Sequence, residues 1–286
     1  MLFRSTRPDY SWPGGRRLAV YVAFNIEAFA YGEGKGSAIA PPDQALSASV
    51  YSWRDYGNRV GAWYLHDAFD SLNLPMAALV NSHMYAYAPE LIAAHRTRGD
   101  EIVGHGRTNA ERQSALDEAG ERALIAEATK VLAAAEGKPP QGWLGPWIAQ
   151  SPVTPDLLAE AGYSYLLDWC MDDQPIWFSC RGGRRILAVP YPQELNDIPA
   201  IAARKENASD FADMIVDQFE EMLELSQTRP LVMGVALHAY IVGQPHRLRH
   251  LKRALKHIAG KRSDIWMTTP GAIARHCAGL PAGIVP

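Results

Sequence analysis

Strand-like and helix-like segments alternate along almost the whole chain, and this alternation limits the possible fold more than any other feature. Helical periodicity separates the apolar runs, for example at Phe211, Ile215 and Phe219. The runs typical of strands are 18–24, 75–80, 101–103, 142–144, 165–168, 186–191, 231–238 and 265–268. Strands alternating with helices of this length indicate parallel βαβ units. We therefore expect an α/β fold, a distorted (β/α) barrel of about seven parallel strands.

Helix boundaries and loops support this organisation. Ser114 and Asp117 are expected to open one helix, and Gly137 is expected to close it. No change of composition marks a boundary, so residues 1–286 are predicted to form a single domain. A Gly/Pro-rich loop at 31–44 follows the first strand and is well placed to cover a site.

Composition excludes several classes of function. A formal charge of -3 gives no general electrostatic reason to bind nucleic acid or a membrane surface. The chain begins without the apolar segment of a secretory signal. Three scattered cysteines, Cys170, Cys180 and Cys277, fit buried free thiols in a reducing compartment better than a disulfide framework. We therefore expect a cytoplasmic protein that acts on a small molecule.

Three apolar runs end in side chains able to do chemistry. Asn25 and Glu27 follow the first strand, His105 follows a short strand between two glycines, and His238 ends the most apolar strand. Active sites of parallel barrels lie at the carboxyl ends of the strands, so Glu27, His105 and His238 are predicted to be catalytic. Glu27 could act as a general base or a metal ligand, and His238 as a proton donor. The alternative is structural: a carboxylate that caps a loop and core histidines bonded to carbonyl oxygens.

Further residues are candidates for substrate binding. Arg107 could hold an anionic group, and Asn109 lies one helical turn after His105 if that segment is helical. Trp143 and Trp147 could wall a pocket for a flat ligand, although such aromatics are often core residues. Asp168 ends another strand, where a carboxylate could orient His238.

Several motifs in register resemble the polysaccharide-deacetylase (NodB-homology) superfamily, above all its branch of allantoinase-like and cyclic-imide-hydrolase-like proteins. The resemblance runs from Trp12 to His276. It is carried by Phe24-Asn25-Ile26-Glu27, Asn58-Arg59-Val60-Gly61, Glu101-Ile102-Val103-Gly104-His105-Gly106, Gly142-Trp143 with Pro146-Trp147, Asp168-Trp169 with Asp173-Gln174-Pro175, and Leu237-His238 with Gly243-Gln244-Pro245-His246-Arg247. The resemblance implies a distorted barrel that hydrolyses carbon–nitrogen bonds other than peptide bonds, often as a homo-oligomer.

The chain departs from the metal-dependent members at four positions. Asn25 stands at the position of the catalytic base, Glu27 at a metal-ligand position, Asn109 at the second histidine, and Leu144 at the arginine of the third motif. An amide cannot act as a base and is a poor zinc ligand beside imidazole or carboxylate. The resemblance thus makes metal-free chemistry credible. A divalent metal such as zinc, if held weakly, would use Glu27, His105 and Asn109.

We expect a hydrolase that acts on a small amide, cyclic imide or ureide without a tightly bound metal. Glu27, or His105 positioned by it, would take a proton from water, and His238 would protonate the leaving nitrogen. Asn25 and Asn109 would hold the amide edges of the substrate. Two alternatives stay open: a metal-dependent carbohydrate N-deacetylase, and a barrel of the same fold that binds a ligand without turnover. The family and the apolar composition suggest a dimer or tetramer.

Overall fold

The structure is a computed structural model that describes residues 6–29, 31 and 48–286. Its centre is one nine-stranded sheet. The strands are β1 (Leu18–Ile26), β2 (Met76–Val80), β3 (Glu101–Gly104), β4 (Gly142–Trp143), β5 (Tyr165–Leu166), β6 (Ile176–Ser179), β7 (Arg185–Ala188), β8 (Leu231–His238) and β9 (Trp266–Thr268). The predicted strands are all present, most of them within a few residues of their expected ends, whereas β6 was not predicted.

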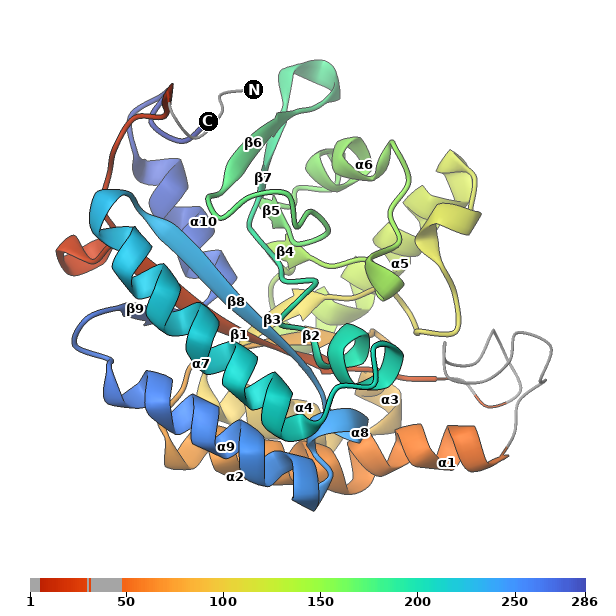
Figure 1. The fold of residues 1–286 in the computed structure, drawn as a ribbon. Helices are drawn as coiled ribbons and strands as arrows, with labels where there is room; N and C mark the ends of the chain where they lie inside the picture. Colours follow the sequence, from red (N-terminus) through yellow and green to blue (C-terminus); the bar gives the residue numbers. More distant parts are fainter. Residues whose placement is uncertain (1–5, 30, 32–47) are drawn as a thin grey trace.

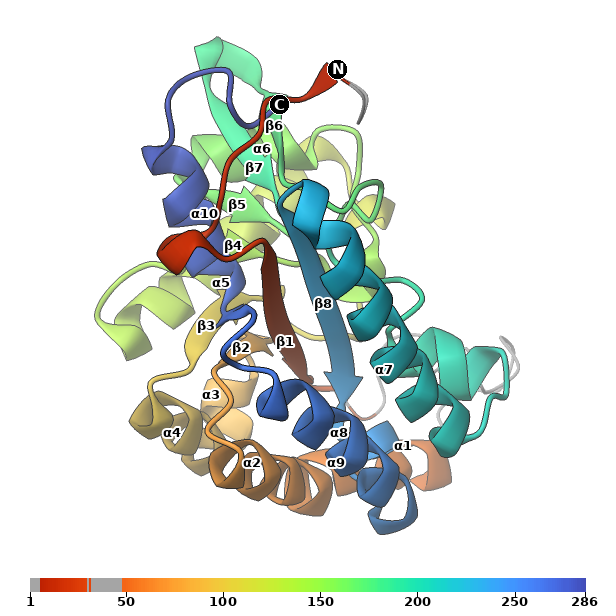
Figure 2. The same ribbon diagram turned by 60° about the vertical axis from the view of Figure 1, so that its left-hand side comes forward.

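The sheet has the strand order β6-β7-β5-β4-β3-β2-β1-β8, and β9 pairs with β1. All of these pairs are parallel except β6 with β7, which is antiparallel. The sheet curls into a half-barrel in which the two long strands β1 and β8 lie side by side (Figures 1 and 2) and β8 ends the strand order. The expected distorted (β/α) barrel is therefore confirmed.

Helices cover the outside of the curled sheet (Figures 1 and 2). They are α1 (Ala48–Tyr56), α2 (Ala62–Ser71), α3 (Met84–Tyr87), α4 (Pro89–Arg98), α5 (Glu118–Glu136), α6 (Thr154–Glu160), α7 (Ala208–Leu225), α8 (Ala239–Val242), α9 (Pro245–Gly260) and α10 (Pro270–Gly279). Helix α5 begins after Asp117, whose side chain caps the Gly120 N–H, and it ends at Gly137. Ser114 lies in a short 3-10 turn before it, so it does not open the helix as expected.

The two faces of β1 pack against different parts of the protein. Leu18, Val20, Val22, Phe24 and Ile26 pack outward against the helices. Ala19, Tyr21 and Ala23 point into the barrel, where they join the inward-facing side chains of the other strands. Because side chains alternate along a strand, Asn25 and Glu27 continue the inward series. The same alternation applies to β8, where Val232 and Ala236 face inward and His238 follows them.

The barrel is completed beside β8 by the segment that follows β7. Asn196 forms an isolated parallel bridge with Ala236, and the Ala236 N–H donates to the Leu195 carbonyl oxygen at 2.9 Å. This pairing carries Asp197 to the carboxyl end of β8. The contact thereby brings the Asp197 carboxylate next to His238, in addition to that of Glu27.

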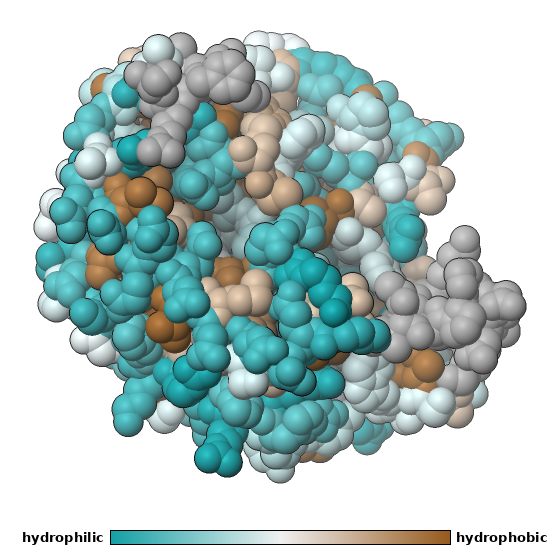
Figure 3. All heavy atoms as spheres, in the orientation of Figure 1, coloured by the Kyte–Doolittle hydropathy of each residue, from teal (hydrophilic) through white to brown (hydrophobic). Residues whose placement is uncertain are grey.

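The molecular surface on the side of Figure 1 is mostly hydrophilic, with hydrophobic side chains in small patches between the hydrophilic ones (Figure 3). Within the described ranges, the helices are all too short or too polar to cross a membrane. The predicted covering loop at 31–44 lies outside the described residues apart from Tyr31. Of the three free cysteines only Cys277 is buried, since Cys170 is exposed and Cys180 is half-buried.

Candidate active site

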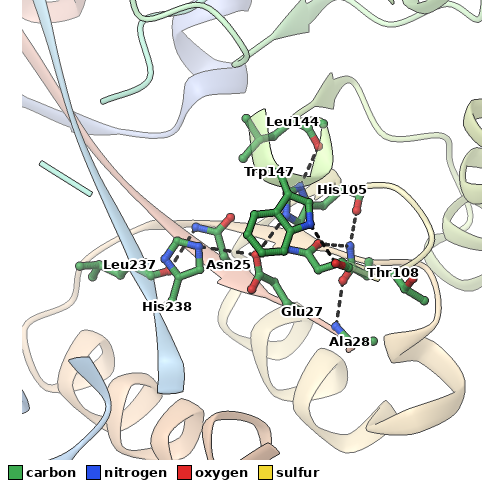
Figure 4. A network of polar contacts seen from close by, with 12 residues as sticks. Asn25, Glu27, Ala28, His105, Thr108, Leu144, Trp147, Leu237 and His238 are labelled. Atoms are coloured by element: carbon green, nitrogen blue, oxygen red, sulfur yellow. Dashed lines mark hydrogen bonds and ion pairs between the residues drawn. The ribbon is translucent and has the colours of Figure 1, made fainter. Parts of the chain in front are cut away.

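Glu27 lies at the centre of a polar cluster at the carboxyl ends of the strands (Figure 4). Its Oε1 is 3.4 Å from Nε2 of His105 and 3.5 Å from Nε2 of His238. The side-chain amide of Asn109 donates to the same oxygen at 2.5 Å. The other oxygen, Oε2, is buried without a hydrogen-bond partner among the described residues. The three predicted catalytic side chains therefore meet at one place, although their roles stay predictions.

His238 lies between two carboxylates. Its Nδ1 is 2.6 Å from Oδ1 of Asp197, and its backbone N–H donates to Oδ2 of the same residue at 2.8 Å. Burial lowers the pKa of His238, but the charges of Asp197 and Glu27 outweigh it and raise the pKa to about 10. The ring is thus an imidazolium at neutral pH, with its Nε2–H on the side of Glu27.

Burial also acts to raise the pKa of Glu27, but the charge of His238 and the hydrogen bond to His105 outweigh it. The pKa of Glu27 lies well below its usual range as a result. Glu27 is therefore ionised at neutral pH and forms an ion pair with His238 inside the barrel. A carboxylate with so low a pKa is a weak base.

His105 has its tautomer set by the backbone. Its Nδ1 is 2.7 Å from the carbonyl oxygen of Leu144, an acceptor only, so Nδ1 carries a hydrogen. Nε2 faces Oε1 of Glu27 at 3.4 Å, to which it donates in the charged ring, and it carries the lone pair in the neutral ring. Gly104 and Gly106 let the chain pass close to its neighbours here, since a Cβ would meet the Trp143 ring at 2.8 Å or Pro146 at 2.6 Å.

A chain of hydrogen bonds fixes the orientation of Asn109. The backbone N–H of Ala28 donates to Oδ1 of Asn81 at 2.8 Å, so the NH2 group of Asn81 points to the opposite side. This NH2 group donates to the His105 carbonyl oxygen and, at 3.1 Å, to Oδ1 of Asn109. The nitrogen of Asn109 must then point at Glu27. The segment is not helical, contrary to the expected helical spacing, but Asn109 still reaches the cluster.

Asn25 and Trp147 border the cluster. The Asn25 amide donates to the Tyr191 hydroxyl and to the Leu237 carbonyl oxygen, both at 3.2 Å. Nε1 of Trp147 donates to the Asn109 carbonyl oxygen at 2.9 Å (Figure 4). The Trp147 backbone has a left-handed φ of 67°. Such a conformation is unusual for a bulky residue and clusters at functional sites.

Three expected substrate-binding residues, Trp143, Arg107 and Asp168, lie elsewhere or make other contacts. Trp143 is fully buried and points out of the barrel, because it alternates with the inward-facing Leu144; its Nε1 donates to Gln113. Arg107 forms ion pairs with Glu111 and Glu127 at 2.7 Å.

Asp168 does not orient His238, which Asp197 does instead. Oδ1 of Asp168 accepts the Gly145 N–H at 2.8 Å, and its Oδ2 is buried without a partner in the described part of the chain. Burial, together with the charge of Glu121 and against the Gly145 hydrogen bond, raises the pKa of Asp168 to about 7.

The cluster does not fit a zinc site. Asn109 turns its NH2 group, not its oxygen, toward Glu27, and its oxygen is used by Asn81. An NH2 group cannot ligate a metal. In the ranges that the structure describes, no three His, Cys, Asp or Glu side chains are arranged to hold a metal ion. The donor set Glu27, His105 and Asn109 is therefore a hydrogen-bonded group.

Sequence reasoning missed Asp197, Tyr191 and Asn81. Asp197 carried the signal used elsewhere, a polar residue soon after an apolar run, but it lies six positions after the expected strand end at 191. Tyr191 continues the inward alternation of Leu187 and Val189. Asn81 directly follows β2, so it could have been found as a polar strand end.

Comparisons with known proteins place this site in a family context. No family model matches the chain. A protein of Schizosaccharomyces pombe named "Putative polysaccharide deacetylase" is 24% identical over 281 residues, which cover 92% of this chain and 86% of that protein.

Two crystal structures resemble the whole chain. A "probable Polysaccharide deacetylase" from Pseudomonas aeruginosa PAO1 has a TM-score of 0.82 and 28% identity, over 93% of this chain and 92% of that one. Puue allantoinase has a TM-score of 0.84 and 27% identity, over 95% of this chain and 94% of that one.

These similarities confirm the resemblance to the polysaccharide-deacetylase superfamily that the motifs predicted. Deacetylases and allantoinase are hydrolases of non-peptide carbon–nitrogen bonds, which is the class expected from the sequence.

Proposed function

We propose that this protein hydrolyses a small amide, cyclic imide or ureide without a tightly bound metal. The observation that carries the proposal is the meeting of a carboxylate and two imidazoles, whose Nε2 atoms both face Oε1 of Glu27. Asp197 and Glu27 hold His238 in its charged form, and the Leu144 carbonyl oxygen fixes the orientation of the His105 ring. A carboxylate and imidazoles within reach of one point are the groups that acid–base catalysis uses.

In the proposed reaction, a water molecule attacks the carbonyl carbon of the substrate. In its neutral form, Nε2 of His105 takes the proton from this water, since the low pKa of Glu27 makes the carboxylate a weak base. The tetrahedral intermediate then collapses, the carbon–nitrogen bond breaks, and Nε2–H of His238 gives its proton to the leaving nitrogen. Backbone N–H groups at the strand ends stabilise the developing oxyanion.

Glu27 has two tasks in this scheme. Its charge keeps His238 protonated, and Oε2, free of protein partners among the described residues, accepts a hydrogen bond from the water or from a substrate N–H. Asn25 and Trp147 hold the substrate at the opening. Glu27 and His238 keep 6% and 5% of their surface exposed, so a substrate has to reach them through this small accessible part.

The cytoplasm is the proposed location, supported by three cysteines that are free thiols. A homo-oligomeric state is proposed from the family resemblance.

A panel of hydantoins, cyclic imides and linear ureides tests the proposal. Wild-type protein should hydrolyse at least one compound, and Glu27→Gln, His105→Ala and His238→Ala should each lose about 100-fold or more in kcat. Glu127→Gln is the matched control, because Glu127 is an exposed carboxylate paired with Arg107. Turnover that survives all three site changes would refute the assignment. Binding of a panel compound without turnover would favour the ligand-binding barrel.

A further inference from the structure

A buried arginine lies next to the candidate active site and has no ionic partner among the described residues. Arg54 is in α1 and is 5% exposed, with its guanidinium over the Phe29 ring at 3.7 Å from the centroid. Nε and Nη2 are both buried and make no hydrogen bond within the described ranges. Stacking on Phe29 stabilises the flat face of the group but leaves these donors unused.

An unpaired buried cation is costly to keep. Burial lowers the pKa of Arg54, and the opposing effects of Tyr240 and Glu27 do not offset it. Other poorly exposed arginines in this fold have partners: Arg7 pairs with Asp172 at 2.5 Å and Arg98 with Asp100 at 3.0 Å. Arg54 differs from them because its Nε and Nη2 have no acceptor in the part of the chain that the structure describes.

The cavity beside Arg54 has room for a small ligand. It is lined by side chains that include Phe29, Tyr51, Asn58 and His83. Asp55 also lines it, but its carboxylate is already bound by Arg59 and by the Tyr87 hydroxyl. The carboxylate nearest in the wall is thus unavailable, and the cavity keeps the positive charge of Arg54.

This cavity adjoins the catalytic cluster. Ala28, which follows Glu27, is part of its wall, and Asn58 donates from the wall to the Glu27 carbonyl oxygen at 2.9 Å. Tyr240 connects the two sites, with its ring centroid 6.0 Å from Phe29 and 6.0 Å from His238. A ligand held at Arg54 would therefore lie next to the Glu27 end of the cluster, and it has to pass Tyr240 to reach His238.

We propose that the Arg54 cavity binds a carboxylate carried by the substrate, so that the substrate is a small amide or ureide acid. Nε and Nη2 form one edge of the guanidinium, and this edge matches the two oxygens of a carboxylate. The inference rests on the proposed function for the amide end of the substrate. It adds that the acid end determines which amides bind.

Calorimetric titration of the full chain with matched pairs of compounds tests the inference. The pairs are N-carbamoylglycine with N-carbamoylglycinamide, and succinamate with succinamide; within each pair only the negative charge differs. Wild-type protein should bind at least one acid about 10-fold or more tightly than its neutral amide. Arg54→Gln should lose this preference and Arg54→Lys should keep part of it.

Arg253→Gln is the control for the loss of one positive charge, because Arg253 is exposed and pairs with Asp213 on the surface. It should bind as the wild type does, and thermal unfolding should show all variants folded. Equal binding of acid and amide in both pairs, failure of both acids to bind at millimolar concentration, or an unchanged preference in Arg54→Gln would overturn the inference. Acetate that binds as tightly as the acids would also overturn it, since the cavity would then hold a free anion.

This test separates the inference from the proposed function, because calorimetry measures binding alone. Protein that prefers the acids but hydrolyses no amide contradicts the proposed function and leaves the carboxylate site in place. Protein that hydrolyses neutral amides without preferring acids contradicts only the inference.

Discussion

Replacing Asp197 with asparagine should remove much of the charge that keeps His238 protonated. The charges of Asp197 and Glu27 outweigh burial and raise the pKa of His238 to about 10. Asp197 raises this pKa more than Glu27 does, both through its charge and through its hydrogen bond. The Asp197→Asn change should therefore lower the pKa of His238 by about two units or more. The new amide can also donate to Nδ1, which favours the neutral ring.

Imidazole nitrogen chemical shifts of His238, followed by NMR against pH, measure this directly. The wild-type ring should stay protonated from about pH 5 to pH 8, whereas the Asp197→Asn ring should begin to titrate within or just above this range. Because the acid must carry its proton to protonate the leaving nitrogen, kcat/KM falls as the pH rises through the pKa of His238. This alkaline limb should move to lower pH in the variant.

Assignment of the His238 signal requires a His238→Gln spectrum, in which the signal should vanish. A wild-type ring that titrates near its ordinary pKa would refute the reasoning, because the two carboxylates would then not hold the charge. An Asp197→Asn ring that titrates like the wild type would show that Glu27 alone is sufficient.

Other predictions test the remaining parts of the site. The pKa of Asp168 is raised to about 7, so the folded state holds this proton more tightly than the unfolded chain, and stability falls as the pH rises from about 4 to 7. Asp168→Asn should therefore have a higher Tm than the wild type at about pH 8 and an equal Tm at about pH 4. A lower Tm of the variant at pH 8 would contradict this. Trp143→Phe should lower Tm but leave KM unchanged, whereas a raised KM would return Trp143 to the pocket wall. Arg107→Gln should change stability by less than about 1 kcal/mol and leave KM unchanged, since its ion pairs are on the surface. Asn81→Ala leaves the Ala28 N–H and the His105 carbonyl oxygen unpaired, and it should lower the free energy of unfolding in denaturant by roughly 1–3 kcal/mol. It should also lower kcat, and an unchanged kcat would show that the orientation of the Asn109 amide does not matter.

The sequence carries enough information to predict the barrel and the convergence of its polar strand ends. Glu27, His105 and His238 each follow an apolar run, and parallel strands bring such ends to one edge. Asn25 of β1 lies opposite His238 of β8, and this register could be derived only after it is known that the two strands pair. Strand order itself cannot be derived from the periodicity of single segments.

The errors concern residues whose direction depends on local geometry. Trp143 was predicted to face a ligand because it ends a strand, but the side-chain alternation with Leu144 turns it outward. Asp197 was missed because its position depends on a bridge between Asn196 and Ala236 outside the regular strands. Long-range pairing of this kind leaves no local pattern in the sequence.

Turnover by metal-stripped protein decides whether Glu27, His105 and His238 do the chemistry as hydrogen-bonded protein groups. Protein freed of metal with a chelator, and checked by elemental analysis, should hydrolyse its best panel compound at the rate of untreated protein, with no increase on adding zinc. Activity that disappears with the metal and returns with one equivalent of zinc would contradict the account.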